Sequence, residues 1–104
     1  MEGFLIDPAA RMVTPVEVEG GVDGVRKLIG FPTVDSDEID DNGDRLYYDE
    51  ECFIRSAPGA PRFRVDNLAP VAGKGVVIGY SAQGKALADA VIGLEALQRR
   101  VTFG

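Results

Sequence analysis

The chain has 104 residues and a mass of 11.1 kDa, which suits a single domain around one apolar core, placed here over residues 1–104. Apolar residues make up 45% and charged residues 27%, a mix that is typical of soluble globular proteins and excludes a fibrous or wholly disordered chain. The net charge is −6, and the absence of histidine together with a single cysteine excludes Ser-His-Asp catalysis, Cys-His catalysis and Cys/His zinc sites.

The first predicted elements are two strands joined by a tight turn. Residues 3–7 indicate a short strand, residues 7–10 have the composition of a turn, and residues 12–18 alternate as a half-buried strand does. Pro15 cannot donate a backbone hydrogen bond, so we expect its nitrogen on an unpaired side of the strand or the strand at a sheet edge. The N-terminal segment is therefore expected to form a hairpin.

A two-turn helix is predicted between the glycine pair at 20–21 and Gly30, because four apolar residues recur there at helical spacing. They are Val22, Val25, Leu28 and Ile29. A helix this short is unstable alone, so its apolar stripe is expected to pack on the sheet.

Residues 31–54 return to a strand pattern that is interrupted at residues 41–44, where Asn42-Gly43 is typical of a tight hairpin turn. Residues 46–48 begin the return strand, and the acidic run 49–51 leads into the apolar segment 52–55. The composition of residues 56–61 predicts a loop.

Two further strands are predicted in the second half. Residues 62–65 alternate strictly, so Arg62 and Arg64 should share one face. Residues 66–70 indicate a turn or a single helical turn, and the bounded apolar run 75–80 indicates a central strand.

Ser81 is expected to cap a long final helix over about residues 82–100. Gly93 lies inside this helix at a cost of about 1 kcal/mol relative to alanine. The fold class predicted from all these elements is α+β, with a mainly antiparallel sheet that carries one short helix and one long C-terminal helix. The apolar residues that define the long helix repeat at spacings of three and four: Leu87, Ala90, Leu94, Leu97 and Val101.

Charge is distributed unevenly along the chain. Residues 17–51 hold twelve acids against three bases, a net charge of −9, whereas residues 52–104 hold seven bases against three acids, a net charge of +4. This asymmetry favours an acidic face that meets a basic protein partner and disfavours direct nucleic-acid binding. The predicted acidic interaction face comprises Asp35, Asp37, Glu38, Asp40, Asp41, Asp44, Asp49, Glu50 and Glu51.

The segment from Glu38 to Asp49 has nearly the oxygen-ligand spacing of an EF-hand loop. Its first position is Glu instead of Asp, its eighth is Arg45, and strands are predicted on both sides, so we interpret it as a solvated hairpin without a metal. Because acids are so abundant here, a tuned catalytic pair is also disfavoured. We therefore assign no catalytic residue, cofactor or enzymatic activity.

A second hypothesis places an anionic ligand, such as a nucleotide, near Arg62, Arg64, Ser81 and Lys85. A third hypothesis uses Leu87, Leu94 and Leu97 as the seam of a homodimer. Tyr47 and Tyr48 suit either an interface or the core, and Cys52 is interpreted as a buried, inert thiol because three acids precede it.

We expect a cytoplasmic protein without a membrane segment. Residues 1–6 lack the apolar stretch of a secretory signal, and no apolar run approaches the roughly 20 residues that span a bilayer. Cys52 has no partner for an intrachain disulfide, which is consistent with a reducing compartment.

Parts of residues 3–80 resemble a family of small uncharacterised domains encoded by phages, plasmids and other mobile elements. The resemblance lies in residues 4–8 and 16–20, in Leu28-Ile29-Gly30, in residues 46–51 and in residues 75–79. It implies no established activity, but small acidic proteins of mobile elements often bind host proteins. The first hypothesis is therefore noncatalytic binding of a basic host surface by the acidic face.

Overall fold

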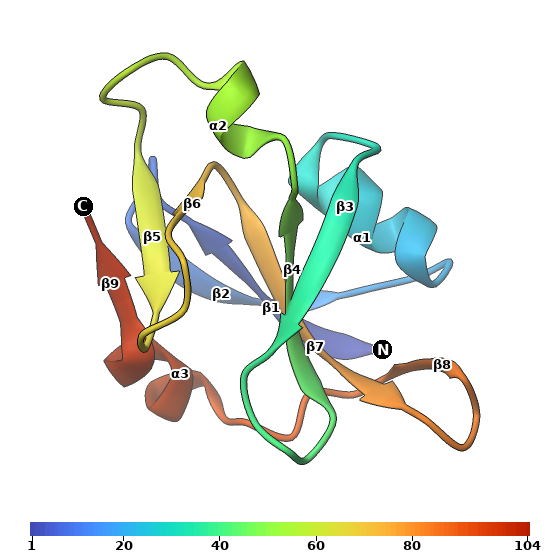
Figure 1. The fold of residues 1–104 in the computed structure, drawn as a ribbon. Helices are drawn as coiled ribbons and strands as arrows, with labels where there is room; N and C mark the ends of the chain where they lie inside the picture. The colour runs from blue at the N-terminus through green and yellow to red at the C-terminus, as the bar shows by residue number, and fades with distance from the viewer.

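The computed structural model describes residues 1–104 as nine strands and three short helices (Figure 1). The elements are β1 (Glu2–Asp7), β2 (Met12–Glu17), α1 (Val22–Ile29), β3 (Val34–Glu38), β4 (Asp44–Asp49), α2 (Cys52–Arg55), β5 (Arg62–Val65), β6 (Val71–Ala72), β7 (Gly75–Ser81), β8 (Ala86–Ala88), α3 (Leu94–Arg100) and β9 (Val101–Phe103).

The larger sheet has the order β2-β1-β7-β4-β3, with β8 also paired to β7, and every pairing is antiparallel. Val76, Val77 and Ile78 of β7 are fully buried, which confirms the predicted central strand. A smaller antiparallel sheet has the order β6-β5-β9.

Both predicted hairpins are confirmed. The β1–β2 turn is held by Asp7, whose Oδ1 accepts the N–H of Ala9 at 3.1 Å, and Pro15 lies on the edge strand β2. In the β3–β4 turn, Gly43 has a φ of +101° and approaches β7 so closely that a Cβ would lie 2.7 Å from the Tyr80 carbonyl oxygen. Glycine is therefore required at that turn both by backbone angle and by space.

The larger sheet is covered on both faces, and each face has its own apolar core. On one face, Val25 and Ile29 of α1 pack with Val76 and Ile78 of β7. Figure 1 shows α1 and the smaller sheet on opposite sides of the larger one. The second core joins both sheets and α3 through Ile6, Val13, Leu46, Cys52, Phe63, Val65, Val71, Ala72, Val77 and Leu97.

The long C-terminal helix predicted over residues 82–100 is wrong. The chain reverses after Ser81 and forms β8, where Leu87 lies opposite Tyr80, and the only helix in this segment is α3. Leu87 belongs to the core under α1, whereas Leu97 belongs to the core between the sheets. The helical spacing of these leucines therefore arises from two elements that face different cores, and Gly93 precedes α3 instead of lying inside a helix.

The strand pattern predicted for residues 31–54 is wrong at its C-terminal end, because residues 52–55 form the single helical turn α2. The Glu51 carbonyl accepts the N–H groups of Ile54 and Arg55 at 3.0 Å each, which closes the turn. The predicted α+β class with a long helix is therefore corrected to a small β-rich domain with three short helices. None of these helices has the length and apolarity needed to cross a bilayer.

Candidate functional site

Asp44 was expected in a solvated acidic face, but the structure buries it completely. Its Oδ1 accepts the N–H of Val91 and its Oδ2 accepts the N–H of Ile92, both at 2.8 Å. These contacts attach the loop that precedes α3 to the start of β4. The prediction of a solvated side chain is wrong here because a carboxylate is stable in the interior when two backbone donors satisfy it.

Asp49 is also inside the molecule, with an exposed fraction of 3%. It accepts hydrogen bonds from the Thr33 hydroxyl, from the Glu51 N–H at 3.1 Å and from Arg55 Nε at 2.9 Å. Burial acts to raise the pKa of this carboxyl, but the hydrogen bonds and the Arg55 charge together outweigh it and lower the pKa below 3.8. Asp49 is therefore an ionised structural group, contrary to the solvated face that was expected.

Three more acids of the predicted face are held in ion pairs. Asp40 binds Arg100 at 2.8 Å, Glu38 binds Arg45 at 3.3 Å, and Glu51 binds Arg55 at 3.0 Å. Arg100 also forms a two-pronged contact with Asp66, which together with Asp40 raises the pKa of the guanidinium. Through these two ion pairs, Arg100 connects the end of α3 to the turn that contains Asp40 and to the turn that contains Asp66.

The two tyrosines occupy different environments. Tyr47 lies in the core under α1, while the Tyr48 hydroxyl donates to Asp37 Oδ2 at 3.2 Å. Burial and the adjacent Asp37 carboxylate raise the pKa of Tyr48 to about 12. Cys52 is buried in the core between the sheets, as predicted.

After these internal contacts, Asp35, Asp37, Asp41 and Glu50 remain without an ion pair. Asp35 and Asp37 lie on β3, which is an edge strand of the larger sheet, and Asp41 lies at the hairpin tip. Four of the nine acids of the predicted face are thus neither buried nor ion-paired, and no group of three acids converges as a metal site requires.

A recess of about 390 Å³ opens at the tip of this hairpin. Tyr80 borders it from β7 and is 40% exposed. Carboxylates with an accessible phenol ring make a surface that suits a cationic side chain. The recess, hereafter the acidic recess, is lined by Glu38, Asp40, Asp41, Asn42, Gly43, Arg45, Tyr80 and Ala82.

The structure does not assemble the anion site predicted from the sequence. Ser81 and Lys85 lie at the β7–β8 hairpin, whereas Arg62 and Arg64 lie on β5 in the other sheet, at the opposite side of the molecule in Figure 1. The Ser81 hydroxyl accepts the Gly84 N–H at 3.2 Å and so stabilises a strand reversal instead of capping a helix. The prediction that these four residues form one site depended on the long helix. Because that helix does not form, the prediction is wrong.

The homodimer seam is wrong for the same reason. Leu87 is 7% exposed and Leu97 is fully buried, and they face different cores within one chain. Leu94 packs at the edge of the core between the sheets. The leucine stripe is therefore used inside the protein and is not available to a second copy.

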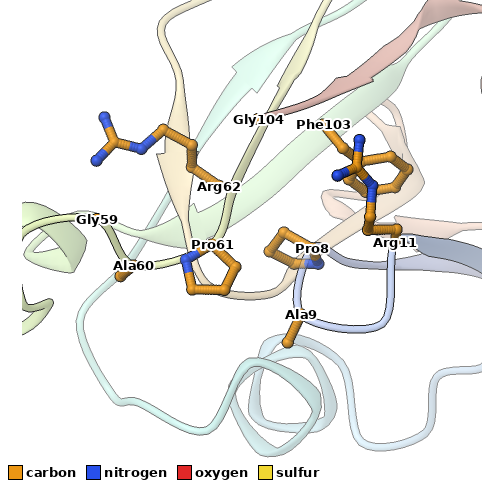
Figure 2. Close-up of a pocket in the computed structure, with 9 residues that line it drawn as sticks. All are labelled: Pro8, Ala9, Arg11, Gly59, Ala60, Pro61, Arg62, Phe103 and Gly104. Atoms are coloured by element: carbon orange, nitrogen blue, oxygen red, sulfur yellow. The ribbon is translucent and has the colours of Figure 1, made fainter.

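Sequence reasoning missed a second hollow, a groove of about 600 Å³ between the β1–β2 turn and the loop that leads into β5. Figure 2 shows the residues that line it. The groove brings Arg62 together with Arg11 and Phe103, which are far apart in the sequence, and no local spacing pattern could indicate their proximity. The groove is lined by Pro8, Ala9, Arg11, Gly59, Ala60, Pro61, Arg62, Phe103 and Gly104. We call it the arginine groove.

The arginine groove and the acidic recess are two hollowed, charged surfaces of this molecule, and each includes an unpaired charged side chain. Comparisons with protein-family models, with curated proteins and with solved structures found no match.

Proposed function

We propose that this protein is a noncatalytic binding protein that engages a basic protein surface through the acidic recess. The observation that carries the proposal is the exposed Tyr80 ring beside the unpaired Asp41 carboxylate in that recess. A lysine or arginine side chain of the partner would enter the recess, contact the ring face and pair with the carboxylate.

The acids on β3 support this role by extending the negative surface away from the recess. Asp35 and Asp37 have no cationic partner within the chain, so their field acts on a partner outside it. Such a field raises the association rate of a basic partner and weakens as salt is added. The buried carboxylates Asp44 and Asp49 are fully engaged in structural contacts, so catalysis receives no support from them.

The resemblance to mobile-element domains suggests the biological setting of this proposal. In that setting the partner would be a host protein with a basic, nucleic-acid-binding surface, and both proteins would meet in the cytoplasm. Binding of the acidic face would then block that surface by charge competition.

A titration with a lysine- and arginine-rich peptide tests the proposal. We expect the affinity to fall by about tenfold or more between low and physiological salt, because the contact depends on charge. Asp41→Asn and Tyr80→Leu should each weaken binding several-fold. Calorimetry or fluorescence anisotropy measures both effects.

Glu19→Gln is the matched control, because Glu19 is exposed and does not line the acidic recess. It changes the net charge by the same amount as Asp41→Asn, so it should leave the peptide affinity nearly unchanged. Equal losses in the two variants, or an affinity that ignores salt, would contradict the proposal.

A further inference from the structure

Three large apolar side chains are exposed to water at one end of the molecule. Their exposed fractions are 84% for Ile54, 51% for Phe53 and 41% for Phe31. Ile54 and Phe53 belong to α2, and Phe31 lies beside that turn, because the Arg55 guanidinium stacks on its ring at 4.4 Å from the centroid. A cluster of exposed side chains of this size is unfavourable in water and is typical of a surface that meets an apolar partner. We call these three residues the apolar end.

The apolar end is convex. Figure 1 shows α2 and the loop of residues 56–61 projecting beyond the strands of both sheets. That loop contains no charged residue. Cys52, the first residue of α2, is buried in the core between the sheets and anchors the projection. A convex apolar projection can enter a fluid lipid interface, whereas a protein partner would have to provide a cavity that matches it.

Two unpaired cations lie close to the apolar end. The Arg62 guanidinium is 5.4 Å from the centroid of the Phe53 ring, and Lys74 is exposed in the turn between β6 and β7. The Gly73 N–H donates to the Pro61 carbonyl at 3.3 Å, which holds that turn against the loop after α2. Neither cation is in an ion pair within the chain. Both charges are therefore available to an anionic partner.

The acidic recess lies at the other end of the larger sheet. β4 runs from the recess to α2, so its six residues separate the recess from the apolar end by about 16 Å, at about 3.3 Å per residue. This separation is about twice the Debye length of about 8 Å at physiological salt. The recess therefore repels a negative surface at the apolar end only weakly, and the charge asymmetry turns this end toward such a surface. Charges around the apolar end itself balance, with Arg55, Arg62 and Lys74 against Asp49, Glu50 and Glu51.

We propose that the apolar end binds the surface of a lipid bilayer that contains anionic lipids. Phe53 and Ile54 enter the boundary between headgroups and acyl chains, and Arg62 and Lys74 contact lipid phosphates. Reversible attachment to a bilayer typically combines these two signals, apolar burial and positive charge. In this orientation the acidic recess faces away from the bilayer, so lipid binding does not depend on the protein-binding function.

Sedimentation with lipid vesicles tests the proposal. The wild-type protein should bind vesicles of phosphatidylcholine with about one third phosphatidylglycerol more tightly than vesicles of phosphatidylcholine alone. The double variant Phe53→Ser/Ile54→Ser should lose about tenfold or more of this affinity, because the apolar contact is removed. The matched control Val22→Ser/Val91→Ser removes two exposed apolar side chains outside the apolar end and should retain most of the affinity. Melting temperatures equal to that of the wild type show that both variants are folded.

The role of the cations is tested separately. Arg62→Gln/Lys74→Gln should lose most of the preference for anionic vesicles and bind pure phosphatidylcholine almost as the wild type does. Lys85→Gln/Arg99→Gln makes the same change in net charge at exposed positions away from the apolar end, so it should keep the preference. Equal losses in these two variants would contradict the proposed contact with lipid phosphates.

A fluorescent reporter tests which end meets the lipid. The chain contains no tryptophan, so Ile54→Trp introduces a single one. Its emission should shift to shorter wavelength when anionic vesicles are added, whereas the emission of Val91→Trp should not. The proposal fails if the wild type binds neither vesicle, which would leave a protein as the partner of this end. It also fails if Phe53→Ser/Ile54→Ser binds as tightly as its control, or if the two tryptophan reporters shift equally.

Discussion

Asp41 and Asp44 lie three residues apart in the same hairpin, yet the first is exposed and the second is fully buried. Asp44 accepts two backbone hydrogen bonds from a loop 47 and 48 residues further along the chain. Asp41 has no ion-pair partner and borders an open recess. Aspartates in one acidic run can therefore be buried structural groups or exposed surface groups, and the difference depends on which distant donors reach them.

The largest effect is expected for Asp44→Ala. This change leaves the N–H groups of Val91 and Ile92 without acceptors and should reduce the free energy of unfolding by about 3 kcal/mol. Urea denaturation followed by circular dichroism measures the loss. Asp44→Asn retains one acceptor oxygen and should lose less, and a loss below about 0.5 kcal/mol in the alanine variant would show that the clamp is not structural.

Asp49→Asn is expected to cost about 1 to 2 kcal/mol at neutral pH, because Arg55, whose side chain is one third exposed, loses its buried partner. The folded-state pKa of Asp49 lies below 3.8, so its stabilisation is present above that pH and disappears as the pH falls through the folded-state pKa. Urea titrations at a series of pH values should therefore show a smaller acid-induced loss in the variant than in the wild type. Parallel curves for the two proteins would contradict this assignment.

A smaller effect is expected at the Tyr48–Asp37 contact on β4 and β3. Asp37→Asn removes the adjacent charge and should lower the pKa of Tyr48 from about 12, although burial, the larger cause, keeps it above 10. Because the folded-state pKa is raised, the stabilisation from neutral Tyr48 is present below pH 10 and is lost as the pH rises toward the folded-state value. Ultraviolet titration of tyrosinate, with Tyr48→Phe as the control that removes this step, measures the shift.

The smallest effect is expected for the exposed acids. Asp35→Asn and Asp41→Asn should each change the free energy of unfolding by less than about 0.5 kcal/mol, since neither carboxylate is buried or ion-paired. The same urea experiment checks this. A loss as large as that of Asp49→Asn would show that the outer acids also have a structural role and would remove the contrast within the hairpin.

Local features that carry their own physical signal were predictable. Asn42-Gly43 specified a hairpin because few residues other than glycine adopt its positive φ, and Pro15 indicated an unpaired strand side or a sheet edge because it lacks an N–H. The alternation of residues 62–65 predicted that Arg62 and Arg64 share one face, and in the structure Phe63 and Val65 are buried on the other face. Each of these signals depends on the chemistry of one residue or on a short period, so no distant contact is needed to interpret it.

The candidate sites were predictable only in part. The acidic character of the β3–β4 hairpin followed from composition, but the identity of its exposed members required knowing that Val91, Ile92 and Arg55 come close to Asp44 and Asp49. The arginine groove joins Arg11 with Phe103, which no spacing relates. Sites made from distant segments leave no local pattern in a single sequence.

The sequence by itself determined the size of the chain, the absence of histidine and the charge asymmetry. It also determined the N-terminal and central hairpins, the helix α1 and the central strand β7. Only the tertiary structure decided that the leucines after Ser81 belong to a strand and a short helix, since pairing with β7 outweighs a helical spacing. It also decided which acids are buried. Burial depends on the backbone donors and cations that the folded chain brings to each carboxylate, and these lie outside any sequence window.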